Sequence, residues 1–251
     1  MKPLPQRHFA VIFLLVISIW SVTSCSNMNN DWRTANRDSS GLAPAPDRSP
    51  EAVVQVYAAR AFNWRGIFAV HTWLATKRAN APHYTVYQVV GWRLRRKLPA
   101  VVADHDIPDR NWFGSRPKII ADLRGPAAAR AITAIEQAVR DYPYPETYGL
   151  WPGPNSNTFT AFVARRVPHL RATLPGTAIG KDFLAYGFPL GWAPSRTGFQ
   201  VSLFGALGFT LAAQEGVEIN LLGLVFGIDF LRPALKLPFI GRIGLPRHDT
   251  S

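Results

Sequence analysis

Cysteine is almost absent from this chain, which carries a single one, Cys25, among 251 residues. One thiol cannot form an internal disulfide, nor can it supply a zinc site built from several cysteines. The sequence also lacks a Walker loop, an HExxH pair and any visible repeat, so the common nucleotide-binding and zinc-protease patterns are excluded. An acidic loop at residues 104–109 could gather carboxylates around an ion, but such loops are generally solvated. We expect no cofactor and no metal site.

Acidic residues are also scarce, with 16 Asp and Glu against 28 Lys and Arg, which gives a formal net charge of +12. Such a balance suits nucleic acid, an anionic membrane surface or an acidic polymer. The basic residues are scattered, apart from one cluster at Arg93, Arg95, Arg96 and Lys97, and no aromatic-plus-glycine pattern accompanies them. We therefore expect a surface that lies near a membrane and no nucleic-acid partner.

The apolar stretch near the N-terminus is too short to cross a membrane. It runs from Phe9 to Trp20, about a dozen residues, whereas a spanning helix needs ~20. Lys2 and Arg7 precede it, and small residues follow it, which is the order of an export signal. The signal is expected to cover residues 1–24.

The signal ends in Val22-Thr23-Ser24-Cys25, which resembles the lipobox of bacterial lipoproteins. The resemblance implies that Cys25 becomes the lipidated first residue and that its acyl chains anchor the protein in a lipid membrane. The alternative is an uncleaved signal anchor with an incidental cysteine, because the bulky Trp20 lies near the cleavage region. Either interpretation places the protein in the cell envelope, on the exported, periplasmic side.

The remaining chain divides into a polar stretch and one domain. Residues 25–50 are rich in Asn, Asp, Ser, Arg and Pro without apolar periodicity, which predicts a flexible tether. Residues 51–247 are predicted to form a single α+β domain. Its first half alternates as strands at residues 53–57, 66–76 and 84–94, with His71 and Trp73 on one face. Helices are predicted from Pro126 to Arg140 and from about residue 156 to before Pro168.

The C-terminal part carries no Lys or Arg from Gly198 to Leu231. Apolar residues recur there with period two on both sides of Gln214-Glu215-Gly216, which predicts two long strands in a curved hairpin. Membrane-dipping segments are the alternative, but Glu215, Glu218 and Asp229 would be costly in lipid. Residues 232–247 are expected to be an irregular basic tail. The predicted fold is therefore an antiparallel sheet with two packed helices and a C-terminal curved β-hairpin.

A rigid stretch, YPYPETYGLWPGPNSNTFTAFVARR, leads into the second helix. Its prolines restrict the approach, and Asn155 or Ser156 is a good N-cap, so Ser156 is expected at the end where free N–H groups favour an oxyanion. Together with a base at His71 and an orienting group at Gln88, Ser156 could act as a nucleophile. The alternative is that His71 is a core residue and Ser156 a cap. In either case, residues 151–159 are expected to line a groove with His71 and Gln88, in which Trp151, Asn155 and Asn157 bind the ligand.

The motifs FAVHTWLATK, YTVYQVVGWR, YPYPETYGLWPGPNSNTF, TAIGKDF and SLFGALG resemble domain of unknown function 3750, which implies no established activity. A weaker resemblance is to papain-like hydrolases of the NlpC/P60 and lecithin-retinol acyltransferase type. It implies the order His71, Gln88, nucleophile, but Ser156 stands where those enzymes have Cys. Two functions follow: hydrolysis or acyl transfer on an envelope amide or ester, with peptidoglycan or lipid as the ligand, or a non-catalytic envelope binding or scaffold protein. The oligomeric state cannot be read from the sequence.

Overall fold

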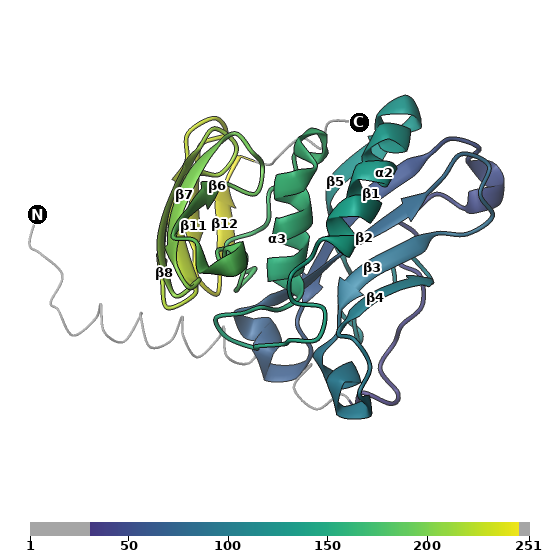
Figure 1. The fold of residues 1–251 in the computed structure, drawn as a ribbon, viewed down its shortest axis with the longest axis horizontal. Helices are drawn as coiled ribbons and strands as arrows, with labels where there is room; N and C mark the ends of the chain where they lie inside the picture. The colour runs from purple at the N-terminus through teal and green to yellow at the C-terminus, as the bar shows by residue number, and fades with distance from the viewer. Residues whose placement is uncertain (1–30, 246–251) are drawn as a thin grey trace, which may run out of the picture.

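The computed structural model describes residues 31–245, and the export signal and Cys25 lie outside them. Two antiparallel sheets lie on either side of helix α3 (Ser156–Arg166), and helix α2 (Gly125–Arg140) packs beside α3 on the first sheet (Figure 1). The predicted α+β class is thus confirmed. None of the described helices is both long enough and apolar enough to cross a membrane.

The N-terminal sheet has five strands in the order β4-β3-β2-β1-β5, all paired antiparallel. The predicted strands form its centre, and the sequence analysis missed both edges, β4 and β5. Residues 66–67 and 91–94, predicted as strand, instead belong to short 3-10 turns. The strands are β1 Val53–Arg60, β2 Val70–Lys77, β3 Thr85–Val89, β4 Val101–His105 and β5 Lys118–Arg124.

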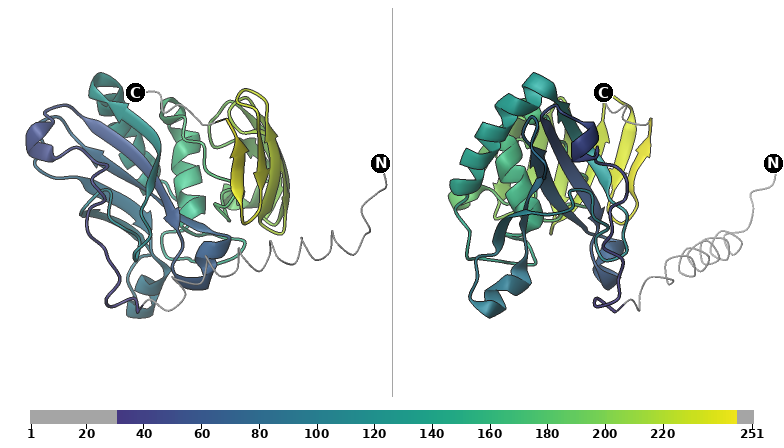
Figure 2. Two further views of the ribbon diagram at one scale, coloured as in Figure 1. Left: turned by 180° about the vertical axis from the view of Figure 1, so that it is seen from behind. Right: turned by 90° about the vertical axis from the view of Figure 1, so that its right-hand side faces the viewer.

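Both predicted helices cover one face of this sheet. Pro126 lies in the first turn of α2, as expected, and its buried stripe meets Val54, Val56 and Leu74 of the sheet. Helix α3 is buried over nine successive residues, Ser156 to Ala164, because the first sheet and the C-terminal sheet cover it from two sides (Figure 2). Short 3-10 turns complete the fold: η2 Pro46–Arg48, η3 Asn63–Ile67, η4 Gly91–Arg96, η5 Pro168–Leu170 and η6 Ala185–Gly187.

The described part of the expected tether, residues 31–50, packs against the other face of the N-terminal sheet. The carboxylate of Asp109 accepts hydrogen bonds from Ser39 and from the backbone N–H groups of Leu42 and Ala43. Leu42 and Ala43 also pack against the apolar cluster that contains Trp73. The stretch predicted as a tether thus has packing partners in its described part, and a polar sequence without periodicity gave no sign of them. These hydrogen bonds also engage the carboxylate of Asp109, which belongs to the acidic loop at residues 104–109.

The C-terminal sheet is a seven-stranded antiparallel meander rather than a two-stranded hairpin. The predicted turn at Gln214-Glu215-Gly216 joins two of its strands, and the expected irregular tail contains the last two. The strands are β6 Leu190–Trp192, β7 Gly198–Leu203, β8 Leu207–Ala212, β9 Gly216–Leu221, β10 Leu224–Asp229, β11 Ala234–Leu237 and β12 Gly241–Gly244.

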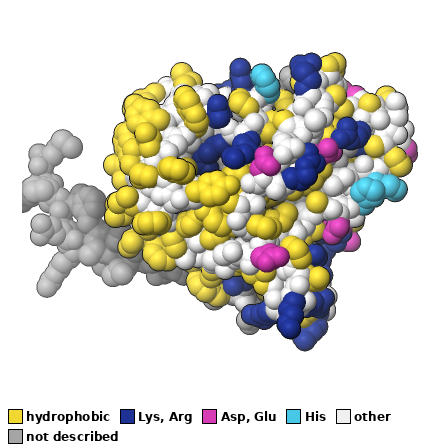
Figure 3. Space-filling model, in the orientation of Figure 1, with side chains coloured by type: hydrophobic (Ala, Val, Ile, Leu, Met, Phe, Trp, Pro, Cys, Tyr) yellow, Lys and Arg dark blue, Asp and Glu magenta, His cyan; other side chains and the backbone are white. Residues whose placement is uncertain are grey.

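The two faces of the C-terminal sheet are reversed relative to an ordinary water-soluble sheet. Side chains that face α3 are polar and buried, among them Gln200, Thr210, Glu218 and Lys236. The alternate positions carry large apolar side chains that remain exposed, and in Figure 3 hydrophobic groups gather over this sheet. The period-two pattern was read correctly, but the face that it marks points outward.

Candidate functional site

The start of α3 is held by a capping box. Asn155 is the N-cap, and its side-chain oxygen accepts hydrogen bonds from the N–H groups of Asn157 (3.0 Å) and Thr158 (3.2 Å). In turn, the hydroxyl oxygen of Thr158 accepts a hydrogen bond from the N–H of Asn155 at 3.1 Å. This arrangement satisfies N–H groups that a helix start otherwise leaves free. The predicted cap is confirmed, but its amide stabilises the helix rather than reaching outward.

Asn157 joins three segments of the fold. Its amide nitrogen donates to the carbonyl groups of Val70 (3.0 Å) and Ile179 (2.8 Å), and its side-chain oxygen accepts from the Thr72 hydroxyl (3.0 Å). The side chain is buried. Asn157 therefore ties α3 to strand β2 and to the loop that follows α3, and its polar atoms are already engaged within the protein.

His71 and Gln88 are brought together as predicted. The imidazole Nε2 lies 3.2 Å from Oε1 of Gln88 across strands β2 and β3. The ring of Trp112 stacks on the imidazole with centroids 3.6 Å apart and planes 9° apart, and Trp73 stacks beside it at 5.7 Å. The sequence showed the contact with Trp73 through strand alternation, but it gave no sign of Trp112, which comes from a distant loop.

Ser156 lies on the other side of the sheet from His71. Neighbouring residues of a strand point to opposite faces, and Thr72 is the one that faces α3, where its hydroxyl lies 3.4 Å from the carbonyl oxygen of Ser156. His71 points to the opposite face, toward Trp112. The structure thus joins His71 to Gln88 but does not bring either of them to Ser156.

Burial makes His71 a weak base. Removal from solvent lowers the pKa of its imidazole from 6.5 to about 3, and the hydrogen bond to Gln88 opposes this shift only in part. A general base works best when its pKa lies near the working pH. A neutral, stacked and buried imidazole of this kind is typical of a core residue.

Trp151 lies against the C-terminal sheet. Its indole N–H donates to the carbonyl of Leu222, in a turn of the C-terminal sheet, at 2.8 Å, while half of the side chain remains exposed. A cavity of about 210 Å³ lies elsewhere, on the side of α3 near residues 183–191, where Phe162, Arg165 and Leu184 contribute to its wall. No predicted site residue lines it.

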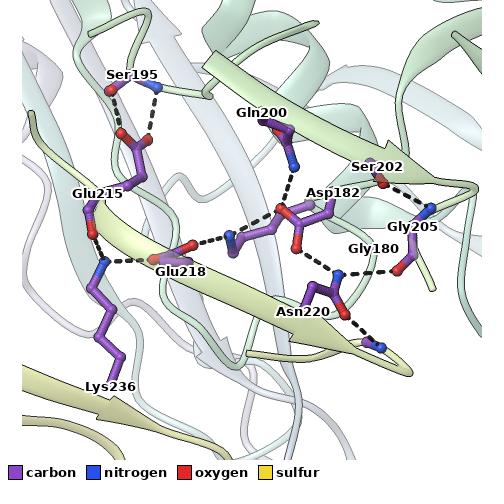
Figure 4. A network of polar contacts seen from close by, with 12 residues as sticks. Gly180, Asp182, Ser195, Gln200, Ser202, Gly205, Glu215, Glu218, Asn220 and Lys236 are labelled. Carbon is purple, nitrogen blue, oxygen red and sulfur yellow. Dashed lines mark hydrogen bonds and ion pairs between the residues drawn. The ribbon is translucent and has the colours of Figure 1, made fainter. Parts of the chain in front are cut away.

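The sequence analysis missed a buried ionic network between the loop after α3 and the C-terminal sheet (Figure 4). Lys181 contacts Asp182 at 3.1 Å and Glu218 at 2.5 Å, and Lys236 contacts the second oxygen of Glu218 at 2.5 Å. Asp182 also accepts from Gln200 and Asn220, both at 2.7 Å. The alternating polar residues of the C-terminal strands were the available signal, but they did not indicate that Lys181 and Asp182 would be their partners.

Charges within this network compensate one another. Burial alone would lower the pKa of Lys181, but the carboxylates of Asp182 and Glu218 outweigh it and raise that pKa. Burial would raise the pKa of Asp182, and the Lys181 ammonium holds it below its ordinary value instead. Burial lowers the pKa of the neighbouring Arg165 to about 10, so its guanidinium stays charged at neutral pH. The network acts as a polar core that holds the second sheet.

Comparison with known protein families gives a match over the N-terminal part of the domain. A family model described as "Protein of unknown function (DUF3750)" matches residues 51–183, slightly more than half of the chain. The match covers the N-terminal sheet and both helices, ends just after Lys181 and Asp182, and leaves the C-terminal sheet outside. No curated protein and no solved structure matches the chain.

Proposed function

The chain belongs to the DUF3750 family of proteins of unknown function, and from this premise we propose that it is a lipid-anchored, non-catalytic binding or scaffold protein of the bacterial envelope. The family resemblance seen in the sequence is confirmed, whereas the papain-like resemblance stays a prediction. The signal pattern and the lipobox ending in Cys25 support the anchor and the exported location.

The observation that carries the non-catalytic role is the separation of His71 from Ser156 by the sheet. Direct proton transfer needs the base within about 2.6–3.2 Å of the nucleophile, or one bridging water between them. His71 instead faces Trp112, and α3 begins on the other face, beside Thr72. The low pKa of His71 and the engaged amides of Asn155 and Asn157 support the same conclusion.

The second candidate is the hydrolase or acyltransferase, acting on a peptidoglycan amide or a lipid ester. The contact between His71 and Gln88 and the position of Ser156 in the first turn of α3 are the observations that favour it. Both belong to the papain-like pattern, and each also has a structural explanation, in aromatic stacking and in helix capping.

Chemical labelling distinguishes the two functions. We expect the purified protein to remain unlabelled by a serine-reactive fluorophosphonate, and Ser156→Cys to gain no turnover on peptidoglycan fragments or acyl-lipid esters. A thiol is more readily ionised than a hydroxyl, so this variant gives a papain-like site its best chance. Labelling that Ser156→Ala and His71→Ala both abolish, in folded protein, would overturn the proposal.

A further inference from the structure

We propose that the outward face of the C-terminal sheet, together with the hairpin turns at one of its ends, rests in the surface of a lipid bilayer. This inference rests on the proposed envelope location and adds a contact that does not depend on the lipidated cysteine. Its occupant is the region where lipid headgroups meet acyl chains.

Three rows of apolar side chains form the outward face. One row pairs in register across all seven strands. With strands ~4.8 Å apart, it is about 30 Å wide, and the three rows cover a footprint of roughly 500 Å². The largest apolar patch of a typical monomer is about 300–600 Å², and such patches often mark interaction sites. The first row consists of Trp192, Phe199, Leu211, Val217, Ile228, Leu235 and Ile243, the second of Leu190, Val201, Phe209, Ile219 and Phe226, and the third of Leu203, Leu207, Leu221 and Leu224.

This face is apolar without interruption. No charged residue occupies an outward position of strands β6 to β12, and Phe209 at its centre is 39 % exposed. The opposite face is held to the loop after α3 by the ion pair of Lys181 with Glu218, which also pairs with Lys236, and these charges are buried. The sheet therefore cannot turn its apolar side inward without breaking that network.

The turns at one end of the sheet carry apolar side chains where polar ones would fit better. Three turns, β7–β8, β9–β10 and β11–β12, open on the same end, because alternate strands of the meander run in the same direction. Their tips are Phe204, Leu222 and Phe239, which we call the tip row. Each has a left-handed backbone, with φ of 52°, 54° and 66°, and each is more than half exposed.

A left-handed backbone costs a bulky residue roughly 1–2 kcal/mol, and Asn or Gly is the usual choice in such turns. Gly205 and Gly223 follow two of the tips with positive φ, in a three-residue turn after Leu203 and a two-residue turn after Leu221. Phe204 and Leu222 therefore weaken their own turns. Exposed apolar side chains that destabilise their own turns are consistent with a surface that inserts into an apolar environment such as a bilayer.

The tip row lies at the end of the molecule from which the described chain starts. Phe239 packs edge-on against Phe68, and Phe68 contacts Trp64, which is half exposed. On the other side of turn η3, Phe62 contacts Phe113, over which the guanidinium of Arg37 lies at 4.4 Å. This string of contacts leads from the tips to a residue only twelve positions after Cys25.

The same end therefore carries the start of the described chain and several exposed indole rings, including those of Trp64 and Trp151. Tryptophan is enriched where membrane and water meet, because its ring is apolar and its N–H is polar. A second copy packed face to face would cover the rows but would leave the tip row and these rings exposed. A bilayer surface contacts all of them.

The sheet is expected to lie within the interface rather than to enter the hydrocarbon core. Its two edge strands, β6 and β12, have backbone groups without a strand partner, and unsatisfied groups of this kind are costly in hydrocarbon. Interfacial elements bury their apolar side to a depth of about 5–10 Å. This depth suffices for the tip row and the outward rows.

Flotation with neutral vesicles tests the proposal. The probe is the mature chain, residues 25–251, carrying Cys25→Ser and made without the signal, mixed with phosphatidylcholine vesicles so that net charge gives no attraction. We expect the chain to float with the vesicles. The triple variant Phe204→Asn, Leu222→Asn and Phe239→Asn should bind at least tenfold more weakly, while its urea midpoint stays equal or rises, since Asn suits those turns.

The matched control is Ile107→Asn, which removes an exposed apolar residue beyond the other end of strand β4 from turn η4 and should leave binding unchanged. A parent chain that does not float, or a triple variant that binds like the parent, overturns the proposal. A lipid-free parent that is dimeric by light scattering and becomes monomeric with Phe209→Lys assigns the face to a second copy instead. These outcomes leave the lipidation of Cys25 untouched, because that modification is read separately by mass spectrometry.

Discussion

At the scale of single residues, strand alternation and capping rules carried most of the correct predictions. The N-cap at Asn155 and the shared face of His71 and Trp73 both follow from local spacing. Trp112 could not be predicted as the partner of His71, because stacking across distant segments leaves no local pattern. Local features of single residues could therefore be predicted, whereas contacts between distant segments could not.

His71 makes stability depend on pH. Its pKa is about 3 in the fold and near 6.5 in the unfolded chain, so the unfolded chain takes up the proton first as pH falls. The stabilisation is complete above about pH 6.5 and is lost toward pH 3, by up to ~1.4 kcal/mol per unit. We expect urea midpoints between pH 7.5 and 5 to fall more steeply for the parent than for His71→Gln.

The exposed His169 provides the control. His169→Gln removes an exposed imidazole outside the His71 cluster and should keep the parent's pH profile. A His71→Gln profile parallel to the parent's would show that His71 is protonated as readily in the folded protein as in the unfolded chain.

At the scale of elements, the sequence revealed central strands and hid edge strands. Strands β4 and β5 are the two edges of the N-terminal sheet and carry charged residues, so their alternation is weak. Strands β11 and β12 are short, lie beside Pro233 and Pro238, and contain Lys236 and Arg242, which indicated an irregular tail. Helix α2 was predicted well, because Pro126 and a regular buried stripe mark it.

The junction between the loop after α3 and the C-terminal sheet depends on Lys181. Replacing it by Met leaves Asp182 and Glu218 buried with less positive charge, and loss of one partner of a buried pair costs about 3–5 kcal/mol. We expect Lys181→Met to lower the free energy of unfolding, measured in urea at pH 7.5, by that amount.

A matched variant is Arg78→Met, which removes the exposed ion pair with Glu136. Exposed pairs contribute about 1 kcal/mol or less, so its effect should be several-fold smaller. Equal losses in the two variants would contradict the structural role given to the buried network.

At the scale of the whole molecule, the period-two pattern of the C-terminal part identified two faces but could not say which one meets water. Apolar faces usually turn inward, and the buried partners Lys181 and Asp182 come from a loop whose position no sequence pattern indicates. The resulting sheet exposes its apolar side and buries its charges. This reversal is easier to understand for a protein held at a lipid surface than for one surrounded by water.

The most direct test of the envelope assignment is intact-mass spectrometry of the protein purified from the membrane fraction of cells that make it from its full sequence. The account predicts a chain that has lost residues 1–24 and carries a diacylglyceryl group and an N-acyl chain on Cys25. A soluble chain that retains Met1 and an unmodified Cys25 would contradict it.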